Sequence, residues 1–202
     1  MGRAYRSWLL GALLGLAGCS HEVVLLDPEP PAPTSGSRPL GLTVSVLPGA
    51  FDRTRLRPEG VLERFSTALR EANLFQGVLY PVPRDIRTEW ELELVVADEG
   101  KEPDSNFWKA AIAAALPPVA LIVRLENEYT LHLEALLLRN RTVIATYVGE
   151  ARIRHRYGPY ANRSNADAEG MELAVRVASR AALGRLHDDL PRIGRLAFGP
   201  PE

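Results

Sequence analysis

Two rows of like-charged residues are the groups in this sequence best suited to binding chemistry. Each row occupies alternate positions of an extended segment: Arg152, Arg154 and Arg156 in one, Glu89, Glu91 and Glu93 in the other. Because alternate side chains of a strand point to the same face, each row lines one face of its strand. If the two strands are neighbours in register, the rows form a ladder of ion pairs, each contributing about 0.2–1 kcal/mol. If they are not, the arginines are a candidate binding face for carboxylates or phosphates.

A pair of carboxylates offers a second kind of chemistry. Glu134 and Glu150 occupy outward-facing positions of a predicted hairpin, where two carboxylates can act as acid and base in a hydrolysis. The other interpretation is that each belongs to an ordinary surface salt bridge. The sequence contains neither a glycine-rich phosphate loop nor a Gly-x-Ser-x-Gly nucleophile motif. We therefore predict no catalytic residues and a protein that is not an enzyme.

The spacing of the histidines argues against a metal site. None of the four lies three or four residues from another or beside a cysteine: they are His21, His132, His155 and His187. His132 and His155 also belong to opposite alternation classes of their strands, so they should point to different faces. We predict no metal and no cofactor.

Cys19 is the only cysteine, and the residues around it form a targeting pattern. Arg3 and Arg6 give a positive start, and residues 8–16 form an apolar run that is shorter than a bilayer span. Small residues precede the cysteine, in the sequence Leu16-Ala17-Gly18-Cys19. The pattern indicates a signal peptide over residues 1–18, the alternative being a buried cysteine in an amino-terminal helix.

This tetrapeptide resembles the lipobox of bacterial lipoproteins, a likeness confined to residues 1–20. It implies that the Cys19 thiol becomes linked to diacylglycerol, that the preceding peptide is removed, and that the new amino terminus is acylated. Three acyl chains exceed what stable membrane anchoring requires. Ser20 is not the aspartate that retains such proteins in the inner membrane of enteric bacteria. The resemblance therefore implies an outer-membrane lipoprotein on the periplasmic side.

Composition limits the remaining chain to one domain of ordinary size. Without the signal peptide, 184 of the 202 residues remain, and 46% of the full chain is hydrophobic. Loss of Arg3 and Arg6 changes the net charge from −1 to −3, which gives no reason to expect nucleic acid. With Cys19 lipidated, no internal disulfide can form, so stability must come from packing.

Proline, glycine and serine divide the mature chain. Residues 19–39 contain Asp27-Pro28-Glu29-Pro30-Pro31 followed by a glycine-serine stretch, a composition typical of a tether. Such a tether would hold the folded body some tens of Å from the membrane, at about 3 Å per extended residue. We predict a single domain over 40–195 and a tail over 196–202.

Hydrophobic periodicity predicts the elements of this domain. Alternation predicts strands over 42–46, 77–80 and 90–96, and a hairpin with arms 129–138 and 142–157 joined by Arg139-Asn140-Arg141. Helical spacing predicts helices over 58–74 and from about residue 164 to Pro191. The fold class is α+β, a mainly antiparallel sheet with two or three helices packed on one face and the other face partly wet.

Residues 107–123 form the most apolar stretch outside the signal peptide, and they admit two interpretations. The first is a buried alanine-rich helix to Leu116, a break at Pro117-Pro118, and a buried strand from Val119 to Arg124. The second is a segment that dips into the membrane, although its prolines are poorly suited to a continuous span.

The favoured function is a non-enzymatic binding or assembly module, anchored to the outer membrane and presenting a sheet face or edge to an envelope protein. On this hypothesis the arginine row would bind peptidoglycan, lipopolysaccharide or an acidic protein. The alternative is an oligomeric secretion or export component in which residues 107–123 or the hairpin enter the membrane. A carboxylate hydrolase using Glu134 and Glu150 is the third hypothesis.

Overall fold

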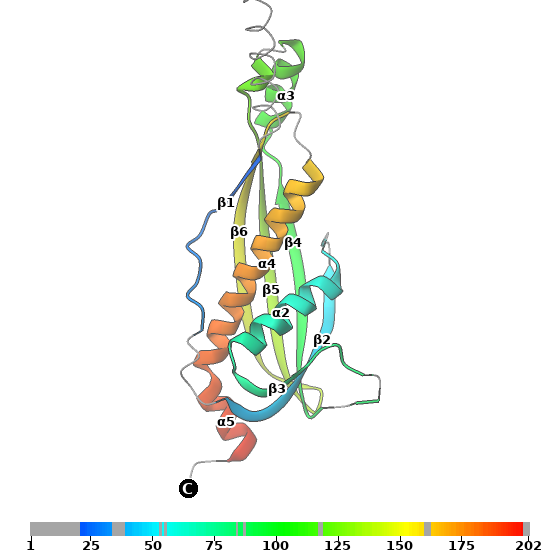
Figure 1. Ribbon diagram of the computed structural model, residues 1–202, viewed down its shortest axis with the longest axis vertical. Helices are drawn as coiled ribbons and strands as arrows, with labels where there is room; N and C mark the ends of the chain where they lie inside the picture. Colours follow the sequence, from blue (N-terminus) through cyan, green and yellow to red (C-terminus); the bar gives the residue numbers. More distant parts are fainter. Residues whose placement is uncertain are drawn as a thin grey trace, which may run out of the picture. The chain divides into compact units, whose positions relative to one another are not determined.

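A computed structural model describes most of the chain (Figure 1). The described residues are 21–33, 39–52, 54, 56–83, 85–86, 88–116, 119–159 and 163–199, and for residues 121 and 163–166 the description covers the backbone alone. The predicted signal peptide, Cys19 and the glycine-serine stretch lie outside the described residues.

The described residues form a six-stranded sheet and four α-helices, which confirms the α+β class. The strands lie in the order β1-β6-β5-β4-β2-β3. Their bounds are β1 His21–Leu25, β2 Leu40–Asp52, β3 Phe75–Leu79, β4 Trp90–Lys101, β5 Leu125–Arg139 and β6 Thr142–Tyr157. The helices are α2 Pro58–Glu71, α3 Ser105–Ala115, α4 Arg163–Asp188 and α5 Leu190–Phe198, with a short 3₁₀ helix η1 at Val119–Leu121.

The sheet is mixed, which corrects the predicted mainly antiparallel arrangement. Strand β2 pairs in parallel with both β3 and β4, and α2 provides the crossover between β2 and β3. Strand β1 pairs antiparallel with β6, and the hairpin turn at Asn140 and Arg141 makes β5 and β6 antiparallel. Both turn residues have positive φ, as a two-residue hairpin turn requires.

Contacts along the chain divide it into two compact units, which β4, β5, β6 and α4 all traverse. The first unit holds the described part of 1–26 together with 100–129 and 152–172. The second holds 27–99, 130–151 and 173–202 in their described parts. In the second unit, α2 and the C-terminal part of α4 cover the same face of the sheet (Figure 1).

The predicted apolar stripes are buried where helix meets sheet. Helix α4 is buried along Met171, Ala174, Val175, Ala178, Ala182 and Leu186, as its helical spacing predicts. Gly149 on β6 allows the closest approach: a Cβ built there would lie 1.9 Å from the carbonyl oxygen of Ala178. Glycine at this position therefore sets how deeply the helix sits on the strand.

Both ends of the folded body differ from the predicted boundaries. Residues 21–25, assigned to the tether, form β1, so the body begins well before Leu40. The segment after β1 also contacts the body, since Glu29 pairs with Arg176 and Arg180 of α4. At the other end, Pro191 separates two helices, and α5 continues into the predicted tail as far as Phe198.

The prediction for residues 107–123 is wrong in two respects. Residues 119–121 are a 3₁₀ helix instead of part of a strand, and β5 begins only at Leu125. The alanine-rich segment does form a helix, but within α3 the buried side chains are Asn106 and Ala113 while the large apolar ones are exposed. No helix within the described residues combines the length and the apolar character needed to cross a membrane.

Candidate functional site

The arginine row lies on the solvent-facing side of β6 and is occupied by ion pairs with β5. Arg154 donates from Nε and Nη2 to Oε1 of Glu128, at 3.0 and 2.6 Å. Arg156 Nε lies 3.2 Å from Oε1 of Glu126. These side chains are 29–40% exposed, so water screens the pairs and each contributes modestly to stability.

Strand β1 flanks the row on its other side. Glu22 is the register partner of Arg156, and their side chains lie 3.9 Å apart. A small surface hollow is lined here by His21, Glu22, Arg124, Glu126 and Arg156. Arg156 therefore sits between acidic groups of β5 and β1.

The other acidic row is not the partner of these arginines. Glu89, Glu91 and Glu93 precede or belong to β4, and β5 lies between β4 and β6 in the sheet. Glu89 instead receives a hydrogen bond of 2.6 Å from Nε of Arg139. A charge ladder exists, but its acidic members are Glu126 and Glu128, which sequence alternation alone did not connect to the arginines.

A buried polar cluster lies on the opposite side of β6, and the sequence interpretation missed it. His155 is fully buried, and its Nδ1 lies 3.0 Å from Oδ1 of Asp167 on α4. The same carboxylate oxygen accepts a hydrogen bond of 3.1 Å from the hydroxyl of Tyr129, which accepts one of 3.2 Å from Asn127. The available signal was a histidine at a core position of its strand, because a buried imidazole needs a polar partner.

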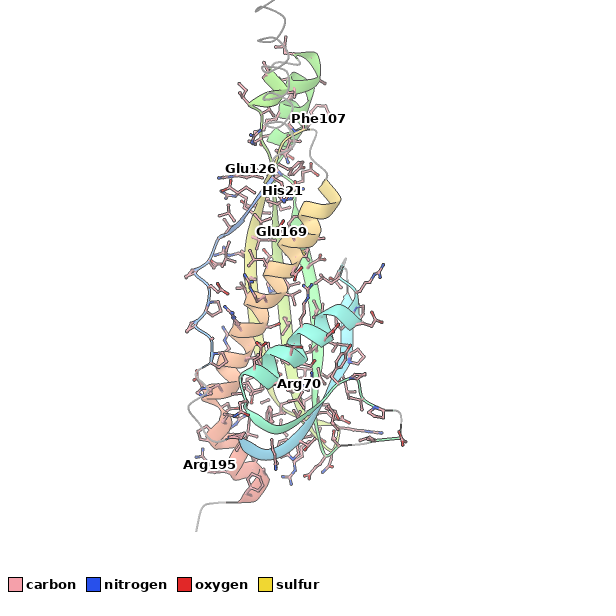
Figure 2. All side chains as sticks on the ribbon, in the orientation of Figure 1. His21, Arg70, Phe107, Glu126, Glu169 and Arg195 are labelled. Atoms are coloured by element: carbon pink, nitrogen blue, oxygen red, sulfur yellow. The ribbon has the colours of Figure 1, made fainter. Side chains whose placement is uncertain are left out.

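Two further contacts fix β1 and α3 within the first unit (Figure 2). His21 Nε2 of β1 lies 3.0 Å from Oε2 of Glu169 on α4. The buried Asn106 side chain donates to the Glu126 carbonyl at 2.6 Å and accepts from the Glu126 N–H at 3.1 Å. An amide that satisfies both backbone groups of one residue holds the start of α3 against the start of β5.

The hairpin carboxylates proposed for a hydrolase, Glu134 and Glu150, are not opposite each other. Glu150 Oε2 lies 3.9 Å from Nδ1 of His132. The pairs Glu126–Arg156, Glu128–Arg154 and His132–Glu150 share one antiparallel register. That register puts Val148, not Glu150, opposite Glu134. His132 is partly exposed and His155 is buried, so they point to different faces of their strands as predicted.

A buried tyrosine links the hairpin to the last turn before α5. The hydroxyl of Tyr147 donates a 2.7 Å hydrogen bond to Oδ2 of Asp189, and burial together with this bond raises the pKa of Tyr147 well above the usual tyrosine value. Within the described part of the chain, no cluster of three or more histidine, cysteine or acidic side chains has the geometry to hold a metal ion.

No protein-family model matches the chain. None of the curated proteins matches its sequence either.

Solved structures do resemble the fold. Protein XCC0632 from Xanthomonas campestris, assigned to the family DUF330, is 13% identical, with a TM-score of 0.51 over 81% of this chain and 94% of the other. An uncharacterized lipoprotein B from Nitrosomonas europaea is 14% identical, with a TM-score of 0.39 over 81% and 93%. The PelC dodecamer from Paraburkholderia phytofirmans is 12% identical, with a TM-score of 0.35 over 80% and 98%. The likeness to XCC0632 shows a shared fold.

Proposed function

We propose that this protein is an outer-membrane lipoprotein of the bacterial envelope that serves as a non-enzymatic binding or assembly module on the periplasmic side. The observation that carries the proposal is the position of β1. Cys19, the residue of the lipobox-like sequence that would be lipidated, stands two residues before His21, where β1 begins. Two residues span at most about 7 Å, so the lipid would be attached almost directly to the sheet.

This position changes the role expected for the proline-rich segment. It follows β1 and joins β1 to β2, so it does not separate the lipid from the folded body. Its Glu29 contacts Arg176 and Arg180 of α4. A lipoprotein built in this way would keep its first unit close to the membrane surface, which suits a module that holds or positions an envelope partner.

Substitution of Cys19 tests the anchoring. Cys19→Ala should yield an uncleaved precursor that incorporates no labelled palmitate and leaves the outer-membrane fraction. Ser20→Asp is the matched control, because it should retain acylation while moving the protein to the inner membrane of an enteric host. Normal processing and membrane retention of Cys19→Ala would overturn the proposal.

The arginine row is the candidate binding face, and its ion pairs make a test possible. Crosslinking in intact cells followed by purification of the lipidated protein would capture an envelope protein partner. If Arg154→Glu folds but loses this partner, the row binds it. If Arg154→Glu lowers stability and still captures the partner, the arginines have a structural role through their ion pairs with Glu126 and Glu128.

An oligomeric export component is the second candidate. The observation that favours it is the exposed apolar surface of α3, which could seat another protomer or a membrane. Native mass measurement in detergent separates the candidates: a large ring supports an export component, and a monomer or dimer argues against it.

A further inference from the structure

The α3–η1 segment exposes its large apolar side chains instead of burying them. Two small residues, Ala113 and Ala120, are 3% and 0% exposed where α3 and η1 pack together, and the other alanines of α3 are exposed. Its large apolar side chains face outward instead: Phe107, Trp108, Ile112, Leu116 and Ile122 are 49–78% exposed. In a helix that faces water, the large side chains would be buried and the small ones exposed.

The exposed side chains are held in place by the fold. Asn106, which is 4% exposed, bonds both backbone groups of Glu126 and fixes the first turn of α3. At the other end, the Val119 N–H donates to the Leu116 carbonyl at 2.8 Å. The rings of Phe107 and Trp108 meet edge to face, with their centroids 5.3 Å apart. The apolar surface is therefore a built feature of the first unit.

The same unit carries the start of β1. His21 and Glu126 line one surface hollow, and the Asn106 side chain of α3 is hydrogen-bonded to the backbone of Glu126. Figure 2 shows His21 and Glu126 close together, with Phe107 beyond them at the α3 end of the first unit. Since Cys19 is only two residues before His21, a lipid on Cys19 would bring a membrane to this end.

We infer that the apolar surface of α3 and η1 inserts into the lipid leaflet that holds the Cys19 anchor, as a second membrane contact. The inference rests on the proposed lipidation of Cys19. Helix α3 has 11 residues, so at 1.5 Å per residue it is about half of a bilayer core in length and would lie in the interface. Tryptophan and phenylalanine are the residues expected at that depth.

The charges near α3 are balanced, which identifies the driving force. Lys101, Lys109 and Arg124 are offset by Glu102, Asp104 and Glu126 in the same stretch. Insertion is therefore driven by apolar burial and needs no anionic lipid. A contact made by a basic surface would instead weaken with salt.

Quenching of Trp108 tests the inference. The mature chain has two tryptophans, Trp90, which is 4% exposed, and Trp108, which is 67% exposed. The acylated full-length protein is reconstituted in phosphatidylcholine vesicles with brominated or ordinary acyl chains. We expect brominated chains to quench the Trp108 component of the emission, equally at low and high salt. Trp108→Phe should abolish the quenching and leave the emission of Trp90.

Two matched substitutions separate insertion from general surface effects. Ile112 is 49% exposed on α3, and Val143 is 50% exposed on β6 in the second unit. Ile112→Glu should reduce the quenching of Trp108, whereas Val143→Glu should leave it unchanged.

The remaining outcomes are distinct. An acylated protein whose Trp108 is not quenched by brominated lipid and is open to aqueous iodide overturns the inference and leaves the proposed function standing. If Trp108 is shielded from both quenchers, a protein surface covers α3, which also overturns it. Absence of acyl chains on Cys19 overturns the proposed anchoring and this inference together.

Discussion

The imidazole of His155, fully buried on β6, lies with its Nδ1 3.0 Å from Oδ1 of Asp167 near the start of α4. The same carboxylate oxygen accepts the hydrogen bond of Tyr129 on β5. One acidic side chain therefore joins the helix to two neighbouring strands inside the first unit, and the arrangement predicts where this unit is most sensitive to substitution.

Removal of the Asp167 carboxylate, the acceptor shared by His155 and Tyr129, should destabilise the fold. Asp167→Ala should lower the free energy of unfolding by about 1–3 kcal/mol, because the buried polar groups of His155 and Tyr129 lose a common partner. Asp167→Asn keeps an acceptor and should cost less. Urea unfolding followed by circular dichroism at pH 7 measures both.

Glu169 provides the control on the same helix. Its pair with His21 is exposed, with 38% of the histidine and 68% of the glutamate side chain accessible. Glu169→Ala should therefore change the unfolding free energy by no more than about 0.5 kcal/mol. Equal losses for Asp167→Ala and Glu169→Ala would show that burial of the cluster contributes nothing.

The ladder on the other face of β6 predicts a rescue by charge exchange. Arg154→Glu places a negative charge beside Glu126 and Glu128 and should cost about 1 kcal/mol. Combining it with Glu128→Arg restores an opposite pair, so the double variant should recover about 0.5–1 kcal/mol of coupling. A double-mutant cycle from urea unfolding at low salt gives this coupling. Strictly additive effects would contradict the ladder.

Elements with a long, regular hydrophobic pattern were predictable from the sequence. Alternation of Trp90, Leu92, Leu94 and Val96 with acidic residues identifies β4, and all four side chains are at most 4% exposed. Local pattern does not state which strands are neighbours. The β2-α2-β3 crossover and the place of β5 between β4 and β6 are long-range choices, so alternation alone could not identify the acidic partners of the arginines.

Short or atypical elements were missed for local reasons. Strand β1 has five residues and adjoins a proline-rich run, which made it look like part of a tether. The proline at 191 predicts the end of a helix, yet at the first turn of α5 its missing N–H costs nothing. In α3, apolar composition predicted burial, but composition does not reveal which side of the helix meets protein. The cluster around Asp167 needed three separate segments and could not be derived from any one of them.

Gly149 should tolerate no side chain. An added Cβ would lie 1.9 Å from the Ala178 carbonyl oxygen, a backbone atom that moves only if α4 shifts on β6. Gly149→Ala should therefore cost about 1–3 kcal/mol through overpacking. The control is Gly184→Ala on α4, where a Cβ would have no atom within 4 Å. Alanine there should raise the free energy of unfolding by as much as about 1 kcal/mol, because its helix propensity is higher than that of glycine. A neutral Gly149→Ala would mean that α4 sits farther from the strand.

Alkaline pH should expose the role of Tyr147. Its pKa is raised in the folded protein, by burial first and by the hydrogen bond to Asp189 second, so the folded state keeps the hydroxyl protonated after the unfolded chain has ionised. The stabilisation is therefore complete below the ordinary tyrosine pKa of about 10 and is lost as pH rises above it. At pH 7, Tyr147→Phe should cost about 1 kcal/mol through the lost hydrogen bond. Between pH 10 and 11, at roughly the onset of tyrosine ionisation, the wild type should lose this part of its stability, whereas Tyr147→Phe has no phenol to ionise. The difference in unfolding free energy between the two proteins should therefore become smaller. Urea midpoints for the two proteins across this range measure this difference. A constant difference would show that Tyr147 titrates alike in both states, and a larger one would show that folding lowers its pKa.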